Sequence, residues 1–565
     1  MKDKQQLLVL LLIVCVVTVF PFLGETLFQS KGEPREAIVA VSMLQTDNWV
    51  LPINNGGDIA YKPPFFHWCI ALCSLLAGQV TEYTSRLPSA LAMVVMAVCT
   101  YLFYARRRSV ELGFVAALVT LTAFEVHRGG WACRVDMVLT MFIVLALFQL
   151  YRWQERNGRG FPFWAVLWMS CATLTKGPVG ILLPCLVTGV YMLIKGRRFW
   201  YTVGKMATIA LASCVLPAVW YVAAYQQGGD AFLDLVMEEN FGRFMGKMSY
   251  SSHEHNLFYN FMTVFSGYVP YTLLMLLALP AAFRALKAWQ RPNSWWQSFK
   301  AYITGMDAAR LFTLLSIVLV FVFYCIPKSK RSTYLLPIYP FIAYFLAEFL
   351  LFLSNRKSSL LRIYGVILSV VAFLPMFAFF LIKGGVVSRF IPADKAESSF
   401  GLIVQTIDST PIDWIHWLYI VLPVVAIVVF VKRQKARRPL LYPVLGIIFT
   451  IYISLDSVYQ PEVMNAKSDK PIAEAIRDKV PDGPLYSYIS TEMMRYFTVN
   501  FYLDNRVLQF EVENPREGYL LIGPHEYESF AKRHTNYEFE EVYRSVKKSC
   551  DTKAPIVMYR FWMKN

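Results

Sequence analysis

Long apolar runs without a charged residue recur along most of the chain. An α-helix rises 1.5 Å per residue, so about 20 apolar residues cross the roughly 30 Å of hydrocarbon in a bilayer. Runs that are long enough, or nearly so, lie at 7–24, 87–105, 177–194, 206–229, 256–283, 311–327, 332–347, 363–382, 414–431 and 439–455. Shorter or end-charged runs at 109–126, 137–151 and 161–175 are plausible further spans. The sequence therefore predicts a polytopic α-helical membrane protein with about 13 transmembrane helices.

Basic residues stand in short clusters between these runs and account for much of the net charge of +16. If the N-terminus is cytoplasmic and the apolar stretch 63–78 does not span, all the clusters fall on the cytoplasmic side. They are Arg106–Arg108; Arg152, Arg156 and Arg159; Lys195, Arg197 and Arg198; Arg284, Lys287 and Arg291; Arg356 and Lys357; and the basic residues of 432–438. This pattern argues against nucleic-acid binding, and it predicts that 63–78 is an interfacial or re-entrant segment.

The hydropathy of the chain changes near residue 458. Beyond it, "PIAEAIRDK" and "ESFAKRH" are typical of soluble helices, and "LYSYI", "GYLLIG" and "PIVMYRFW" of strands. We therefore expect a transmembrane domain over 1–457, with an extracytoplasmic loop at 25–86, and a small extracytoplasmic α/β domain over 458–565. The first apolar run is interpreted as a retained span, and the ten cysteines show neither disulfide nor metal-binding spacing.

The first extracytoplasmic loop carries unusual charges for a membrane protein. Glu33 and Glu36 flank Arg35, and Lys62 precedes a double proline. A carboxylate here can act as a general base, and a lysine at the membrane plane suits a lipid phosphate. The alternatives are a solvated acid or a helix N-terminal charge for the two glutamates, and a snorkelling anchor for Lys62.

Other extracytoplasmic loops add further polar candidates. Asp136 opens an apolar helix, as a cap or as a functional acid, and Lys176 stands at a Gly-Pro break, where a turn lysine is the alternative. Lys328, Lys330 and Arg331 are out of place by the positive-inside rule unless they bind an anion. His253 and His255 flank Glu254, so a divalent metal is an open alternative, although two histidines at this spacing are weak evidence.

Several stretches, in this order, resemble the polytopic GT-C glycosyltransferases. They are "EPREAIVAVSMLQTDNWVLPINNGGDIAYKPPFFHW", "SRLPSALA", "RVDMVLTMF", "LTKGPVGILLP", "ENFGRF", "HEHNLFY" and "YLLPIYP". The match is with the branch that holds the protein O-mannosyltransferases and the bacterial lipid A aminoarabinose transferases. It runs from about Leu7 to Phe352, and beyond about residue 360 only the architecture is similar.

The resemblance implies a sugar donor on polyprenyl phosphate and transfer outside the cytoplasm, usually with inversion, to a lipid, glycan or protein. It implies an acid in the first loop, commonly an Asp-Glu pair, where this chain has Gly32 and Glu33. Glu33 is then the expected base, with Glu36 or Asp136 as substitutes.

The resemblance also implies a donor-phosphate contact for Lys62. It places Lys176 and Tyr334 near the carrier phosphate and Asp136 at the second-loop acid. The family glutamate that helps hold a metal is Tyr61 here, and His255 matches the other ligand loosely, so no cofactor is certain.

Two functions remain to be compared. The first is a glycosyltransferase of the bacterial inner membrane that acts on the periplasmic side, with membrane lipids around it and no nucleic-acid partner. The second is a transporter or flippase for a lipid-linked anion, which would use the same cations without a base. No internal repeat is visible in the sequence, and many transporters carry one, which favours the enzyme.

Overall fold

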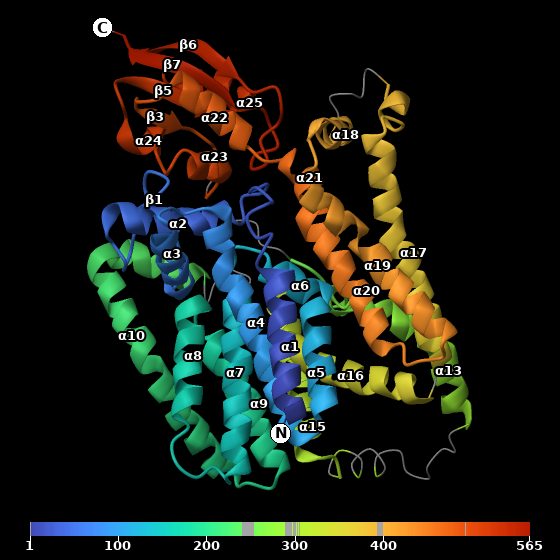
Figure 1. Cartoon of the computed structure of the whole chain (residues 1–565). Coiled ribbons are helices and arrows are strands. Elements are labelled where there is room, and N and C mark those ends of the chain that lie inside the picture. The colour runs from blue at the N-terminus through green and yellow to red at the C-terminus, as the bar shows by residue number, and fades with distance from the viewer. Residues whose placement is uncertain are drawn as a thin grey trace.

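The computed structural model describes residues 2–239, 254–288, 297, 301, 303, 305–356, 358–392, 399–491 and 493–564. Apolar helices form a bundle, and a small sheet domain lies at one end of it, opposite the end that holds the N-terminus (Figure 1). The bundle helices are α1 (Lys2–Val19), α4 (Glu82–Arg107), α5 (Val110–Thr122), α6 (Phe124–Gly130), α7 (Val135–Glu155), α8 (Phe163–Lys176), α9 (Val179–Ile194), α10 (Phe199–Met237), α12 (Phe258–Gly267), α13 (Tyr271–Ala288), α15 (Ala308–Cys325), the 3-10 helix η2 (Ser332–Ile338), α16 (Tyr339–Arg356), α17 (Ser358–Lys383), α19 (Trp414–Lys435) and α20 (Leu441–Ser454). Short elements η3 (Ser388–Phe390), α18 (Ser399–Ser409), the π-helix η5 (Leu455–Tyr459) and α21 (Gln460–Asn465) follow α17 and α20.

Each of the 13 predicted spans falls on a helix or on a bent helix pair. By length and composition, 8 helices of the described chain can cross a membrane, or up to 10 if each bent pair counts as one span. Helices α8 and α9, with 14 and 16 residues, are short for 30 Å of hydrocarbon, and α1 begins with three charged residues. These three nevertheless pack in the bundle, α1 against α4 and α5, and α8 and α9 against α7.

Exposed apolar side chains agree with a lipid environment. On α10, Leu211, Val215, Val219 and Val222 recur every three or four residues and are 58–72% exposed. Such a stripe faces one side of the helix, and in water it would be an unfavourable surface. The polytopic helical fold that the sequence predicts is therefore confirmed.

The first loop folds into α2 (Pro34–Thr46), a two-residue hairpin of β1 (Ile53–Asn54) and β2 (Asp58–Ile59), and α3 (Phe65–Ala77). With 13 residues, α3 is too short for a span, as predicted for 63–78. Leu72, Leu75 and Leu76 on α3 are 56–93% exposed, which suits a helix lying in the membrane interface.

The C-terminal segment forms a five-stranded sheet with helices. Its elements are α22 (Lys470–Lys479), β3 (Leu485–Ser487), α23 (Phe497–Tyr502), β4 (Val507–Gln509), α24 (Phe510–Glu513), β5 (Glu517–Ile522), α25 (Pro524–Arg533), β6 (Tyr537–Arg544) and β7 (Val557–Met563). The strand order is β4-β3-β5-β7-β6, parallel across β4, β3 and β5 and antiparallel for the rest. The predicted strands and helices are all present; β4 and β6 are additions.

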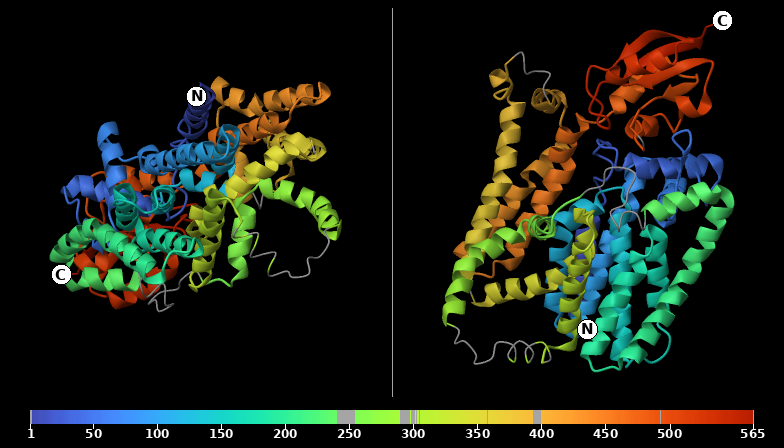
Figure 2. Two further views of the ribbon diagram at one scale, coloured as in Figure 1. Left: turned by 90° about the horizontal axis from the view of Figure 1, so that it is seen from below. Right: turned by 180° about the vertical axis from the view of Figure 1, so that it is seen from behind.

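This C-terminal unit lies directly over the first loop, as both side views show (Figures 1 and 2). Asn55 is one point of attachment: its backbone N–H donates to Asn505 Oδ1 at 2.9 Å, and its side chain accepts from Asn500 at 2.9 Å. Gly56 has φ +66°, and a Cβ there would lie 2.5 Å from the Cα of Leu508. The hairpin tip can therefore touch the sheet backbone only because residue 56 has no side chain.

A buried arginine fixes the start of the same loop to the bundle. Arg86 on α4 is 2% exposed, and its Nε and Nη2 donate to the two oxygens of Glu33 at 2.8 and 3.1 Å. Its Nη1 donates to the carbonyls of Leu23 and Thr26 at 2.7 and 2.5 Å. One side chain thus ties the chain before α2 and the residue that precedes α2 to α4.

We predict that Arg86→Met lowers the free energy of unfolding by about 3–5 kcal/mol, because it leaves the Glu33 carboxylate buried without its partner. Thermal and denaturant unfolding of the protein in lipid nanodiscs measures this. Arg544→Met removes an exposed ion pair with Glu541 and should leave the unfolding midpoint unchanged. Equal midpoints for the two variants would contradict the anchoring role of Arg86.

Candidate functional site

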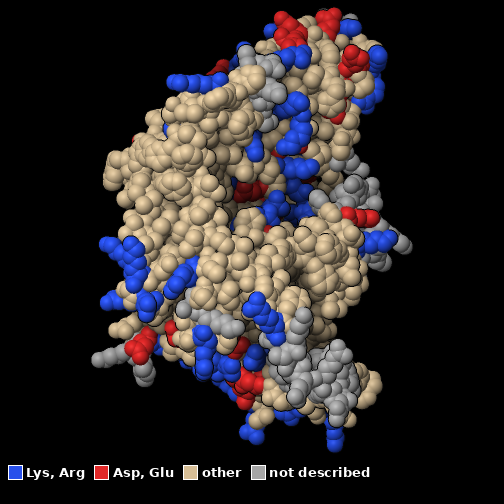
Figure 3. Space-filling view, turned by 90° about the vertical axis from the view of Figure 1, so that its right-hand side faces the viewer, with Lys and Arg blue, Asp and Glu red and all other residues tan. Residues whose placement is uncertain are grey.

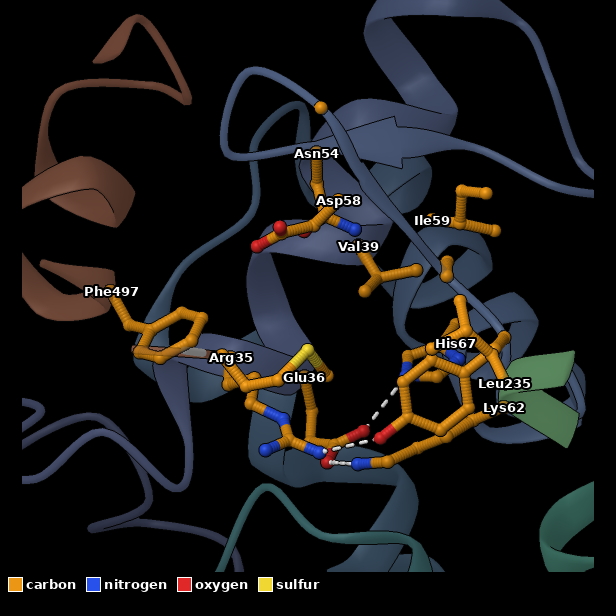
Figure 4. Close-up of a pocket in the computed structure, with 14 residues that line it drawn as sticks. Arg35, Glu36, Val39, Asn54, Asp58, Ile59, Lys62, His67, Leu235 and Phe497 are labelled. Carbon is orange, nitrogen blue, oxygen red and sulfur yellow. Dashed lines mark hydrogen bonds and ion pairs between the residues drawn. The ribbon is translucent and has the colours of Figure 1, made fainter. Parts of the chain in front are cut away.

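A cavity of about 200 Å³ lies between the first loop, the end of α10 and the C-terminal unit (Figure 4). Three parts of the chain supply its wall. The residues are Arg35, Glu36 and Val39 of α2, Asn54 and 57–62 of the hairpin segment, His67 of α3, Leu235 of α10, and Met493 and Phe497 of the C-terminal unit. The predicted residues Arg35, Glu36, Tyr61 and Lys62 are thereby brought together.

Glu36 is the centre of the polar contacts in this cavity. One of its oxygens accepts from the ammonium of Lys62, and the other lies 2.9 Å from Nε2 of His67, which is 1% exposed. Pro34 begins α2 and Glu36 lies in its first turn, where a carboxylate is favoured by the helix dipole. Glu36 is therefore both a charge at the N-terminus of a helix, which was the alternative interpretation, and a residue of the cavity wall.

The surroundings shift the pKa values of this ion pair. Burial raises the pKa of Glu36, but Lys62, the bond from His67 and the charge of Arg35 outweigh it and hold the pKa well below its ordinary value. Burial and the nearby charge of Arg35 lower the pKa of Lys62 to about 8, although Glu36 acts in the opposite direction. Glu36 is a carboxylate at neutral pH, and Lys62 loses its charge far more easily than an exposed lysine.

The loop around the pair is held from several sides. Arg35 Nη2 donates to the hydroxyl of Tyr61 at 3.2 Å. The indoles of Trp220 and Trp68 donate to the carbonyls of Val50 and Trp49 at 3.0 and 2.7 Å. A segment with little regular structure is thus kept rigid over the membrane helices.

Glu33 does not line the cavity. Besides the two bonds from Arg86, its Oε1 accepts the backbone N–H of Cys133 at 2.9 Å. Burial raises the pKa of Glu33, but the charge and hydrogen bonds of Arg86, the Cys133 N–H and the charge of Arg134 outweigh it and lower the pKa. Its lone pairs are therefore engaged in holding the loop.

Gly32 stands at the position where the resemblance implies the first acid of the Asp-Glu pair, and its surroundings leave no room for a side chain. A Cβ at Gly32 would collide with Nη2 of Arg134 and lie 3.0 Å from its Cζ. The guanidinium of Arg134 therefore occupies the place that an aspartate side chain would need. One helical turn further on, Glu36 supplies a carboxylate instead.

A second polar group surrounds Asp136, in the first turn of α7. Asp136 is buried and pairs with Lys176, the last residue of α8, whose ammonium lies 4.6 Å from the ring centre of Tyr334. The positive charges of Arg134 and Arg331 also interact with the Asp136 carboxylate. These contacts bring Asp136, Lys176 and Tyr334 together, and the roles that the resemblance implies for them stay predictions.

Two guanidinium groups beside this region, those of Arg134 and Arg331, are not engaged in hydrogen bonds with any described residue. Within the described ranges, the side chains of Arg134 and Arg331 make no hydrogen bond and no ion pair. A partly buried guanidinium without an acceptor is well placed to take an anion. Figure 3 shows one face of the molecule where Lys and Arg gather in a hollow between wide uncharged surfaces.

The remaining predicted residues have other surroundings. Lys330 is buried and donates to the carbonyl of Pro327 at 2.6 Å, which fixes a turn, and the Lys328 side chain is exposed. His255 is exposed and stacks on Tyr259, with ring centres 4.1 Å apart. His253 lies outside the described residues.

Tyr61 and His255 stand at the two positions where the resemblance implies metal ligands. The Tyr61 hydroxyl accepts from Arg35, and His255 is in no group of three His, Cys, Asp or Glu side chains among the described residues. Among the described residues, the one group of three that could hold an ion is Asp469, Cys550 and Asp551, in the C-terminal unit. Asp469 already accepts from the Cys550 N–H and the Ser549 hydroxyl, so this group acts within the fold.

Sequence reasoning missed several residues of the site. Phe497 was not singled out, and His67, Asp58, Arg134 and Arg86 appeared only inside longer motifs. Arg134 stands two positions before Asp136, which is a signal that could have drawn attention to it. His67, which contacts Glu36, is 31 positions away in the sequence, and no local pattern predicts this contact.

Residues 61–221 match the model of the dolichyl-phosphate-mannose-protein mannosyltransferase family. An uncharacterised protein of Aquifex aeolicus is 28% identical over 62% of this chain and 64% of its own length. The undecaprenyl phosphate-alpha-4-amino-4-deoxy-L-arabinose arabinosyl transferase of Shewanella sediminis is 25% identical over 65% of this chain and 64% of its own. The chain thus spans slightly less than two thirds of the length of these relatives.

A crystal structure of ArnT from Cupriavidus metallidurans bound to undecaprenyl phosphate superimposes with a TM-score of 0.71, at 20% identity, over 98% of this chain and 97% of that one. The apo structure of the same protein gives a TM-score of 0.68 at 20% identity over the same shares. The chain therefore shares the fold of these structures, and the family match over residues 61–221 supports the resemblance to the GT-C glycosyltransferases that the motifs predicted.

Proposed function

We propose that this protein is a membrane glycosyltransferase that moves a sugar from a polyprenyl-phosphate donor to an acceptor of the cell envelope. The observation that carries the proposal is the contact between a carboxylate, Glu36, and a cation, Lys62, at the wall of a cavity above the membrane helices. One group can activate an acceptor and the other can bind a phosphate. The similarity to the undecaprenyl phosphate-alpha-4-amino-4-deoxy-L-arabinose arabinosyl transferase of Shewanella sediminis supports this donor class.

The donor phosphate is proposed to bind beside Lys62, with its lipid tail in the bilayer. Arg134 and Arg331, which lack partners among the described residues, and Lys176 next to Tyr334 offer further positive charge in the adjoining region. Bidentate guanidinium contacts suit a phosphate, and they would stabilise it as it leaves with the bonding electrons of the sugar.

The acceptor is proposed to approach on the Glu36 side. When the phosphate draws the Lys62 ammonium toward it, one oxygen of Glu36 is released while His67 keeps the other in place. The released oxygen takes the proton of the acceptor hydroxyl. The acceptor oxygen then bonds to the anomeric carbon as the bond from that carbon to the phosphate oxygen breaks, a single displacement that inverts the configuration.

The finer points follow from the same reasoning. The site and the C-terminal unit are proposed to face the periplasm of a bacterial inner membrane, because the clusters of basic residues mark the opposite end as cytoplasmic. The acceptor is a lipid A-like glycolipid, another glycan or a protein. The transferred sugar is a hexose or a pentose, and the cavity of about 200 Å³ has room for one ring.

We predict that Glu36→Gln lowers the rate of transfer by about 10²–10⁴-fold with little effect on donor binding, because the amide cannot take a proton. The measurement follows loss of label from radiolabelled undecaprenyl-phosphate sugars in the presence of an envelope lipid extract. Glu33→Gln is the matched variant. It should reduce stability, and the fraction that remains folded should transfer at a near-normal rate.

Each other outcome has a definite meaning. Normal transfer by Glu36→Gln together with folded but inactive Glu33→Gln would assign the base to Glu33 instead. If the wild-type protein binds the donors saturably but turns none of them over, the transporter or flippase becomes the better account. Binding of no donor would contradict both functions.

The pKa of Lys62 gives a prediction on pH. A lysine with a pKa of about 8 carries its charge below that pH and loses it above, so the KM for the donor should rise as the pH passes about 8. Lys62→Arg keeps its charge to far higher pH and should move this limit upward. A KM of the wild type that stays constant from pH 7 to 10 would contradict a phosphate contact through Lys62.

A further inference from the structure

Asp58, on β2, is an acid of the cavity that the mechanism above does not use. It lines the same cavity as Glu36 but at a separate place in the wall (Figure 4). The two carboxylates therefore face one space from different positions. Glu36 is occupied by Lys62 and His67, whereas Asp58 has partners from another part of the chain.

Two side chains of the C-terminal unit donate to Asp58, and both bind the same carboxylate oxygen. Arg495 Nη2 donates to Asp58 Oδ1 at 2.8 Å, and Gln509 Nε2 donates to the same atom at 3.2 Å. Within the part of the chain that the structure describes, Oδ2 accepts no hydrogen bond. A carboxylate has about four acceptor sites, so half of this group remains unused.

The supporting residues are themselves fixed. Arg495 Nη1 donates to the carbonyl of Met494 at 2.6 Å, and Gln509 also donates to the carbonyl of Asn55 at 2.9 Å. Burial raises the pKa of Asp58, and the charge and hydrogen bonds of Arg495 and Gln509 do not offset this effect. The carboxylate is therefore held in place through one oxygen, and its side chain, which is 26% exposed, can be reached by a ligand.

The cavity has the character of a monosaccharide site. Its volume of about 200 Å³ is small, which suits one sugar ring better than an oligosaccharide. Phe497 and Met493 give it an apolar side, and Arg35, Glu36 and Asp58 give it polar groups. A sugar ring likewise has an apolar face and a rim of hydrogen-bonding groups.

We propose that Asp58, positioned by Arg495 and Gln509, accepts a hydrogen bond from a hydroxyl or amino group of the transferred sugar and so selects the donor. This inference rests on the proposed function and goes beyond it. It makes Asp58 a substrate-binding residue and Arg495 a positioning residue. The C-terminal unit would then decide which sugar the membrane domain transfers.

The test compares the binding of a carrier with and without its sugar. The probes are undecaprenyl phosphate, its 4-amino-4-deoxy-L-arabinose conjugate and its mannose conjugate, and the full-length protein is held in lipid nanodiscs. The variants are Asp58→Asn, Arg495→Met and Arg495→Lys. Arg544→Met, which removes an exposed ion pair on β6, is the matched control.

Asp58→Asn should weaken binding of at least one sugar-bearing carrier by about ten- to hundredfold and leave the affinity for undecaprenyl phosphate unchanged. Loss with both conjugates indicates a hydroxyl, and loss with the amino sugar alone indicates the amino group. Arg495→Met should raise the KM for the same donor with a smaller effect on kcat. Arg495→Lys should recover part of the affinity, because a lysine can still reach a carboxylate.

Three results would overturn the inference. Unchanged binding of both conjugates to Asp58→Asn excludes a sugar contact. Equal loss of undecaprenyl phosphate and of its conjugates assigns Asp58 to the phosphate or to the fold. In both cases wild-type transfer leaves the proposed function standing, whereas a wild type that binds no carrier at all removes the proposed function together with this inference.

Discussion

The ion pair between Arg86 and Glu33 is the interaction on which the arrangement of the site depends. It joins α4 to the residue before α2, and two further bonds from Arg86 hold the carbonyls of Leu23 and Thr26. Glu36 follows one turn later on α2, so its position at the cavity is set by this anchor. Because a buried ion pair that loses one partner is strongly destabilised, the loop has little freedom to take another arrangement.

Charges of both signs are collected at one end of the helix bundle. Glu36 pairs with Lys62, Asp136 pairs with Lys176, and Arg134 and Arg331 lie beside them without partners in the described chain. In each pair the lysine ammonium contacts a carboxylate and could also contact an incoming anion. Under the proposed function, such pairs would let each lysine turn from its carboxylate toward a phosphate over a short distance.

Sequence patterns predicted the helices, the interfacial nature of 63–78 and the strands of the C-terminal segment, because these depend on local composition. They also brought Glu36, Lys62, Asp136 and Lys176 into view. Contacts between distant segments were out of reach: Arg495 binds Asp58 from 437 positions away, and no spacing rule connects the two. The position of the Arg134 guanidinium beside Gly32 depends on the folded structure, and no sequence pattern predicts it.

The most direct test of this account is a cryo-electron microscopy structure of the wild-type protein with undecaprenyl phosphate in a lipid nanodisc. The account predicts phosphate density next to the Lys62 ammonium and within reach of Arg134 or Arg331, with the Lys62–Glu36 contact lengthened. Phosphate density at the opposite end of the bundle, near the basic clusters at the ends of α4 and α7, would contradict it. So would density at the site with Lys62 still paired only to Glu36.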